Sequence, residues 1–457
     1  MTRTEGGSIP QADDTQPTAK PRGGSARSMT ITLVGNFFPA AIALATGPIL
    51  AQSLGVEGRG QVAAATAPLG LAIALMTFGV PEAVSYAVAR HPRLVRTAAR
   101  NGFLLIILAG LLATAAVLSA RGWLSGGELE IQHLMVVASL AVMPTLLLGV
   151  LRGIASGLQQ WSMVAWEKVL ASGLRLLVLL PLWLTGHLTP FTAVVVLAAM
   201  PVMGAIAYLW LPRRLPPPEA DTEKVASTKA ITGYGMRLWI GTISGVLLSR
   251  VDQTLITPLS SAYQLGLYVV AVNVSEIPLI IHRSVRDVTF VTDAHRSEDA
   301  KLAASARIST LICTVVALGL GLTMGWWLPI LFGEEFAPAV PIAALLLVAV
   351  VLSTPGSIAG AGLSARGRPG LRSIALVIAC VVNVGLLVVL VSEYGALGAA
   401  WATVLGYLLS SALNQFFLKR LFGVSMLSFY GLRRSDLGIL RRYAAGIGRV
   451  LRLRRRR

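Results

Sequence analysis

The chain has 457 residues, of which 55% are hydrophobic and only 13% are charged, and its mean hydropathy is +0.71. A soluble globular protein has about a quarter charged residues, so this composition excludes most soluble enzymes, disordered chains and disulfide scaffolds. The net charge is nevertheless +18, and much of the excess lies in an Arg-rich stretch after Lys419. The composition indicates an all-α polytopic membrane protein.

Twelve apolar stretches follow one another along the chain, each about 20 residues or longer, the length that a helix needs to cross the hydrocarbon core. They cover residues 30–54, 62–89, 101–120, 131–151, 163–186, 190–211, 231–256, 263–290, 302–328, 338–363, 371–392 and 396–418. Residues 1–28 are polar, and we expect them to form a disordered cytoplasmic N-tail. No secretory signal peptide is expected, because the first apolar run begins late and continues into a span.

The loop charges orient these spans, because cytoplasmic loops collect Lys and Arg. The loops after the even-numbered spans are basic, as in residues 90–100 and 366–372. The loops after the odd-numbered spans hold only two basic residues, Arg59 and Arg121, beside acids such as Glu334. Both termini are therefore expected in the cytoplasm.

The longest linker between spans, residues 212–230, divides the chain into an N-lobe (29–211) and a C-lobe (231–420) of six spans each. The lobes share a weak internal repeat, because the segment around Gly60 resembles the segment around Gly266, 206 residues later. An even number of spans per half makes this a parallel repeat, with its pseudo-twofold axis along the membrane normal. Chance similarity between apolar segments is the alternative.

Four groups of short motifs occur along the spans in a fixed order. They are residues 54–60 (LGVEGRG) with 78–81 (FGVP), 248–253 (LSRVDQ) with 265–268 (LGLY), 329–340 (PILFGEEFAPAV), and Asn383 with 393–400 (EYGALGAA). Together they resemble the polysaccharide and O-antigen flippases of the multidrug, oligosaccharidyl-lipid and polysaccharide exporter superfamily. The resemblance implies two six-helix lobes around a central cavity. It implies as cargo an oligosaccharide on a polyprenyl diphosphate, moved from the inner to the outer leaflet for surface polysaccharide or lipopolysaccharide biosynthesis.

The chain departs from the sequence patterns of two other transporter classes, which narrows the range of candidate cargoes and classes. Lipid II flippases of this superfamily generally carry two further helices that form a lipid groove, whereas only a short mixed stretch and a basic tail follow Arg420 here. They also tend to place basic residues in the first span, which has none in this chain. Lipid II is therefore the weaker candidate. The loop 90–100 lacks the Gly and Asp of the major facilitator class, which disfavours that class as well.

A diphosphate needs a water-filled cavity with cations to cross the membrane, and ionisable residues inside spans are functional candidates by default. Arg175 lies about 18 Å from the start of its span, near mid-membrane, at 1.5 Å rise per residue. We predict that it lines a cationic cavity together with Arg237, Arg250 and Arg286. A structural partner is the alternative role for Arg175, and a solvated position near the inner end is the alternative for Arg286.

Three carboxylates are candidates for coupling transport to protons or sodium: Glu276, Asp252 and Glu82. The alternative for Glu276 is a simple ion pair with an arginine, and the alternative for Asp252 is pairing with a neighbouring helix. No catalytic residue, metal site or cofactor is predicted, because the sequence has neither an ATP-binding Gly-x-x-x-x-Gly-Lys-Ser/Thr loop nor a His or Cys cluster at metal spacing. The sequence therefore predicts a transporter and no enzyme.

The C-tail (421–457) intersperses aliphatic residues with pairs of Arg, which is typical of a basic amphipathic helix on anionic inner-leaflet lipids. Nucleic-acid binding is the rival interpretation of an Arg-rich run, and the apolar body beside it disfavours that. The composition also suggests a bacterial plasma membrane, where a glycan polymerase and glycosyltransferases are the expected partners. Two other functions stay open: a cation-coupled drug or metabolite exporter of the same superfamily, and a scaffold without transport.

Overall fold

The computed structural model describes residues 24–217, 228–295, 297–431, 433 and 436, and every regular element in them is helical. The α-helices are α1 (Gly24–Met76), α2 (Val80–Arg90), α3 (Val95–Leu124), α4 (Leu129–Ser139), α5 (Val142–Gly157), α6 (Trp161–Leu184), α7 (Pro190–Met203), α8 (Thr228–Leu259), α9 (Ala262–His295), α10 (Asp299–Phe332), α11 (Ala339–Ala365) and α12 (Pro369–Phe422). Short 3-10 helices lie at Pro92–Leu94 (η1), Gly204–Tyr208 (η2), Leu211–Arg214 (η3), Glu334–Phe336 (η4) and Met426–Phe429 (η5).

The predicted spans are present, although some pairs of spans form one long helix and other spans are divided between two helices. α1 holds the first two spans and bends at Gly55 (φ 64°, ψ −174°), and α12 holds the last two and bends at Gly395 (φ 55°, ψ −133°). Glycine adopts such positive φ values at little steric cost, so one residue replaces a loop at each bend. The second span continues into α2 after a break at residues 77–79, and the fourth consists of α4 and α5.

Eight helical stretches of the described residues are long and apolar enough to cross a membrane, judged by length and composition. One of the eight lies in α1 and one in α12, and because each of these two helices holds two predicted spans, the eight stretches account for ten spans. The helices α6 and α8 supply the remaining two. α6 differs from the eight because it carries Glu167, Lys168 and Arg175. The predicted all-α, twelve-span architecture is therefore confirmed.

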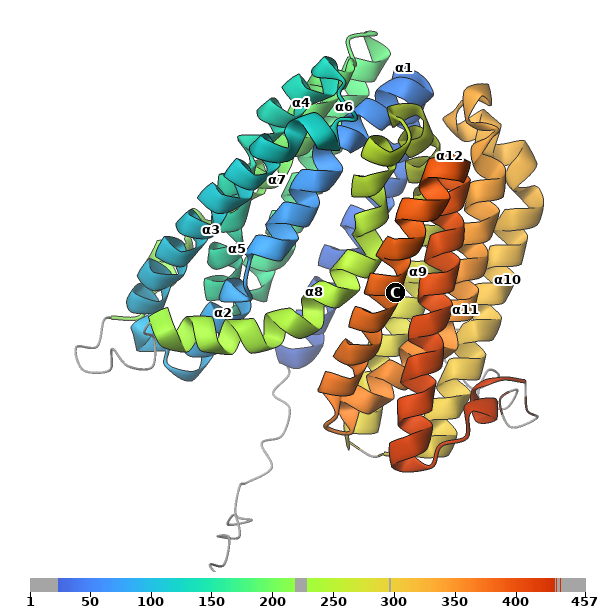
Figure 1. The fold of residues 1–457 in the computed structure, drawn as a ribbon. Helices are drawn as coiled ribbons and strands as arrows, with labels where there is room; N and C mark the ends of the chain where they lie inside the picture. Colours follow the sequence, from blue (N-terminus) through green and yellow to red (C-terminus); the bar gives the residue numbers. More distant parts are fainter. Residues whose placement is uncertain (1–23, 218–227, 296, 432, 434–435, 437–457) are drawn as a thin grey trace, which may run out of the picture.

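The predicted tail and linker fall largely outside the described residues, at 1–23 and 218–227. The first helix begins at Gly24, before the predicted start of the N-lobe at residue 29. Two helical bundles stand side by side in Figure 1, with α1–α7 in the N-lobe and α8–α12 in the C-lobe. The lobes contact each other where α1 packs on α8 and α9, and where the N-terminal half of α8 crosses to α2 and α3.

Two glycines related by the sequence repeat lie where α1, after its bend, meets the first turns of α9. A Cβ at Gly60 would lie 1.8 Å from the carbonyl oxygen of Ala262, and a Cβ at Gly266 would lie 2.1 Å from that of Val56. The contact is reciprocal, because each glycine faces the backbone oxygen four residues before the other. A twofold axis that relates the two lobes predicts such a reciprocal contact. We call the contact of Gly60 with Gly266 the glycine seam.

The opposite ends of the lobes are joined by α8. Gly79 adopts a positive φ of 65° in the break between α1 and α2, and a Cβ there would lie 2.3 Å from the carbonyl oxygen of Gly235 in α8. The indole nitrogen of Trp239 donates a hydrogen bond of 2.8 Å to the carbonyl oxygen of Leu75. The lobes are thus in contact at both ends.

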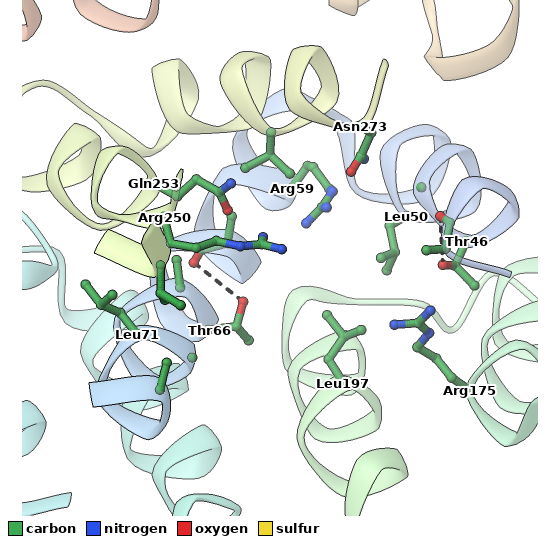
Figure 2. A pocket seen from close by; sticks show the side chains of 18 residues that line it. Thr46, Leu50, Arg59, Thr66, Leu71, Arg175, Leu197, Arg250, Gln253 and Asn273 are labelled. Carbon is green, nitrogen blue, oxygen red and sulfur yellow. Dashed lines mark hydrogen bonds between the residues drawn. The ribbon is translucent and has the colours of Figure 1, made fainter. Parts of the chain in front are cut away.

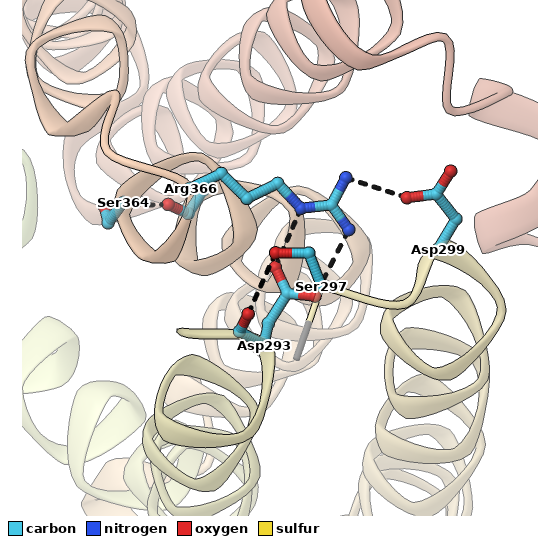
Figure 3. Close-up of polar contacts among 6 residues, drawn as sticks. Asp293, Ser297, Asp299, Ser364 and Arg366 are labelled. Atoms are coloured by element: carbon cyan, nitrogen blue, oxygen red, sulfur yellow. Dashed lines mark hydrogen bonds and ion pairs between the residues drawn. The ribbon is translucent and has the colours of Figure 1, made fainter. Parts of the chain in front are cut away.

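Arg366, at the end of α11, holds three helix ends of the C-lobe together (Figure 3). Its Nε donates to Oδ2 of Asp293 in α9 over 2.9 Å, and its Nη1 donates to Oδ1 of Asp299 in α10 over 2.8 Å. The side chains of Arg366 and Asp293 are each only 5% exposed. The ion pair of Arg366 with Asp293 is therefore buried, whereas Asp299, whose side chain is 56% exposed, lies at its edge.

The first part of the predicted C-tail packs on the C-lobe. Val424 and Phe429 are buried with Leu302 and Leu418, in a small apolar cluster between the N-terminal end of α10 and the C-terminal end of α12. Arg307 in α10 binds both carboxylate oxygens of Asp436, each at 2.7 Å, and donates to the carbonyl oxygen of Ser428 at 2.6 Å. The remainder of the tail, residues 437–457, lies outside the described residues.

Asp436→Asn is expected to release this C-terminal segment at neutral pH, because Arg307 stays buried without a counter-ion, at a cost of about 3–5 kcal/mol. In the wild type, the hydrogen bonds from Arg307 hold the pKa of Asp436 below its ordinary value. A lowered pKa stabilises docking above the ordinary pKa of aspartate, and this stabilisation is lost as the pH falls through the lowered value. The wild-type segment is therefore expected to detach only in acid.

Limited proteolysis of the full-length protein in detergent, from neutral pH to about pH 3, measures this release. Asp287→Asn is the matched control, because the Asp287 side chain is 70% exposed. A segment that is as protected in Asp436→Asn as in the wild type would contradict the expectation.

Candidate functional site

A cavity of about 520 Å³ lies between the two lobes, within the size range of ligand pockets. Its walls come from α1, α6 and α7 of the N-lobe and from α8 and α9 of the C-lobe. Most of the lining residues are small or apolar, such as Ala63, Gly70 and Leu197. The polar exceptions are Thr46, Thr66, Gln253, Asn273 and three arginines.

The three arginines are Arg59 from α1, Arg175 from α6 and Arg250 from α8, and Figure 2 shows their side chains reaching into the same space. No Asp or Glu is among the described residues that line this cavity. The walls therefore carry positive charge that no carboxylate of the lining neutralises.

Two of these arginines are poorly satisfied by the protein itself. Arg59 is 9% exposed, and the buried Nε atoms of Arg59 and Arg175 have no hydrogen-bond partner in the described part of the chain. A buried cation without a counter-ion costs several kcal/mol. An anion that enters the cavity supplies the missing partner, so the arrangement is suited to bind negatively charged groups.

Arg59 was missed by the sequence prediction, which placed it in a loop outside the membrane. The bend at Gly55 lets the helix resume at once, so Arg59 already belongs to the second half of α1. Arg59, Ala63, Thr66 and Gly70 follow one another at spacings of three and four residues and all line the cavity. That polar and small face at helical spacing is the signal in the sequence that identifies Arg59.

The other predicted cations are placed differently. Arg175 and Arg250 line the cavity, whereas the side chain of Arg237 lies outside the described residues. Arg286 is not among the lining residues, and its Nη2 donates a hydrogen bond of 2.9 Å to Oδ1 of Asp287, a residue that is largely exposed. The structure thus brings together two of the four predicted arginines with Arg59.

The predicted carboxylates lie in two smaller pockets beside the cavity. Asp252 and Glu276 line a C-lobe pocket of about 50 Å³, which we call the acidic pocket. Asp252 is buried and accepts a short hydrogen bond from the hydroxyl of Tyr268 in α9, so it does pair with a neighbouring helix. Glu82 is exposed and lines a pocket of about 40 Å³ beside Trp239.

Glu276 in α9 forms a loose ion pair with Arg250 in α8, with 3.7 Å between Oε1 and Nη2. This pair connects the acidic pocket with the central cavity. In the part of the chain that the structure describes, no three His, Cys, Asp or Glu side chains gather closely enough to hold a metal ion.

The fold resembles solved transporter structures at low sequence identity. The TM-score is 0.67 to the lipid II flippase MurJ in an inward closed conformation, at 14% identity, over 85% of this chain and 87% of that one. It is 0.66 to an inward-facing multidrug resistance MATE family transporter of the MOP superfamily, at 17% identity, over 85% of this chain and 97% of that one. These similarities confirm the two-lobe, twelve-helix fold.

The sequence also matches a curated relative and a protein family. The probable low-salt glycan biosynthesis flippase Agl15 of Haloferax volcanii is 25% identical over 199 residues, which are 42% of this chain and 42% of that protein. The match thus spans less than half of the relative's length. The profile of the family described as "Polysaccharide biosynthesis protein" matches residues 25–290, which is more than half of the chain. The chain therefore belongs to the polysaccharide biosynthesis protein family, as the motifs along its spans predict.

Proposed function

We propose that the protein is a flippase that moves a polyprenyl-diphosphate-linked oligosaccharide from the inner to the outer leaflet for surface polysaccharide biosynthesis. The observation that carries this proposal is the cavity between the lobes, lined by Arg59, Arg175 and Arg250 and by no described carboxylate. Diphosphate oxygens accept charge-assisted hydrogen bonds from guanidinium groups. The family and the glycan flippase name of the Haloferax relative support a glycan cargo.

Movement of the cargo is proposed to follow alternating access. The diphosphate and the first sugars occupy the cavity, while the polyprenyl tail stays in the surrounding lipid. The glycine seam separates when the cavity opens to the outside, and the contact of α8 with Gly79 separates when it opens to the inside. Two lobes related by a parallel pseudo-twofold axis are suited to such rocking.

Energy is proposed to come from a proton or sodium gradient, with Asp252, Glu276 and Glu82 as the coupling carboxylates. No bound cofactor is part of the proposal, and the protein is proposed to act without catalysis. Its setting is a bacterial plasma membrane with both termini in the cytoplasm. There the basic tail binds anionic inner-leaflet lipids, and a glycan polymerase and glycosyltransferases are the proposed protein partners.

The test is mass spectrometry of polyprenyl-diphosphate glycans in cells depleted of this protein, with enzymatic accessibility to separate the two leaflets. We expect one oligosaccharide to accumulate on the cytoplasmic face, which would also identify the cargo. If nothing accumulates and the surface glycan is intact, the proposal is wrong. The exporter of drugs or metabolites then becomes the leading function, although cationic drugs do not suit a cavity lined by three arginines.

A further inference from the structure

Arg250 is the one described residue that lines both the central cavity and the acidic pocket. On the cavity side it shares the space with Arg59 and Arg175. On the pocket side its Nη2 lies 3.7 Å from Oε1 of Glu276, and the two side chains are 53% and 36% exposed. Arg250 therefore lies between the arginines of the cavity and the carboxylates of the acidic pocket. Its ion pair with Glu276 is long and partly exposed, so the two groups can separate.

The charges of the acidic pocket balance only when Arg250 is counted. The pocket is lined by two carboxylates, from Asp252 and Glu276, and two guanidinium groups, from Arg250 and Arg283. Tyr268 and Tyr407 are the other titratable residues of the lining, and α11 contributes only the apolar Leu346, Ala349 and Val350. If the Arg250 guanidinium leaves, the pocket keeps one negative charge in excess. Asp252 retains its bond from Tyr268, so Glu276 is the carboxylate that loses its partner.

The empty and the occupied cavity act on Arg250 in opposite directions. In the empty cavity, the like charges of Arg59 and Arg175 repel Arg250 and favour its contact with Glu276. A bound anion neutralises that repulsion and offers oxygen atoms that a guanidinium can bind with two parallel hydrogen bonds. The side chain of Arg250 is long enough to line both spaces already, so a change of partner requires a change of rotamer and no movement of the backbone.

We propose that Arg250 links cargo binding to proton uptake: a diphosphate in the cavity takes the guanidinium of Arg250 from Glu276, and the Glu276 carboxylate then binds one proton from water. The inference rests on the proposed function, because it assumes an anionic cargo. The only covalent change is transfer of a proton from a hydronium ion of the solvent to Glu276, which breaks one O–H bond and forms another, and release of the cargo reverses it. Cargo and proton therefore bind together, and neither expels the other.

Proton uptake on binding can be counted by isothermal titration calorimetry in two buffers of different ionisation enthalpy. The full-length protein in nanodiscs is titrated with farnesyl diphosphate at about pH 5, where a glutamate carboxylate ordinarily takes up a proton. The wild type is expected to take up more protons per bound diphosphate than Glu276→Gln does, by up to about one. Glu276→Gln is also expected to bind the probe about two- to fivefold more tightly, because it removes the competitor for Arg250.

Two further variants complete the experiment. Arg250→Gln is expected to bind the probe more weakly than the wild type and to take up no more protons than Glu276→Gln does. Glu393→Gln, an exposed carboxylate of α12 that lines neither space, is the control and is expected to match the wild type.

The outcomes separate this inference from the function on which it rests. Equal proton uptake by the wild type and Glu276→Gln on binding of the probe overturns the role of Arg250 and leaves the proposed cargo standing. Weaker binding by Glu276→Gln also overturns it, because that result indicates a merely structural carboxylate. If the wild type binds no diphosphate at all, the proposed cargo and the inference fail together.

Discussion

Replacing Arg59 or Arg175 by methionine is expected to lower transport of the lipid-linked oligosaccharide by about ten- to a hundredfold at unchanged membrane abundance. Each guanidinium lines the cavity and has a buried Nε without a protein partner. A hydrogen bond to a charged group contributes about 1.5–3 kcal/mol, and each 1.4 kcal/mol is a factor of about ten. Restoration of surface glycan in depleted cells, with the variant quantified in the membrane, measures the loss.

The stability of the same variants separates a binding role from a structural one. Because a buried, unpaired cation destabilises the empty protein, Arg59→Met is expected to leave the Tm of the purified protein unchanged or to raise it. Arg121→Met is the control, because Arg121 is exposed and does not line the cavity. Full transport by both Arg59→Met and Arg175→Met would contradict the account, and so would a marked drop in Tm as the cause of lost transport.

Gly60→Ala is expected to force the glycine seam apart and shift the protein toward states open at that end. Real Cβ atoms essentially never lie closer than 3.0 Å to another atom, and here the distance to the Ala262 oxygen would be 1.8 Å. Overpacking of this kind costs about 1–3 kcal/mol, so the closed state is expected to lose about five- to a hundredfold in relative population. The same substitution at Gly266 is expected to have the same effect, because the contact is reciprocal.

Cysteine labelling measures this shift. Cys313 and Cys380 are both buried and are first replaced by alanine, after which Thr66→Cys reports access to the cavity for a membrane-impermeant maleimide added from outside. Gly385→Ala in α12 is the matched control, because Gly385 is exposed, lines none of the three pockets, and a Cβ there meets no atom within 4 Å. Equal labelling and equal transport in Gly60→Ala and Gly385→Ala would refute the gating role of the seam.

The sequence was sufficient for the number of spans, the two lobes and the repeat, because these depend on hydrophobic length and on local similarity. The position of a residue along its helix was also predictable, since the rise per residue of a helix is fixed, and Arg175 and Arg250 do line the cavity. The direction in which a side chain points was not predictable. It depends on neighbouring helices that the sequence does not place.

Three residues illustrate that limit. Arg286 lies in the same helix as Glu276 but bonds to its neighbour Asp287 and lines none of the pockets described above. Asp252 is bound by Tyr268, sixteen residues later, through the packing of α8 on α9. Asp436 was assigned to a tail, yet it is fully buried against Arg307, 129 residues earlier in the chain. The placements of Asp252 and Asp436 follow from tertiary packing and have no local signature.

The most direct test of the central claim is flipping by the purified protein in proteoliposomes. A diphosphate-linked glycolipid with a quenchable label is placed in both leaflets, and loss of fluorescence after an impermeant reductant reports the exchange between them. We predict rapid exchange with the wild type and exchange at the rate of empty liposomes with the Arg59→Met, Arg175→Met double variant. Exchange by the double variant at the wild-type rate, or none by the wild type, would contradict transport through the cavity between the lobes.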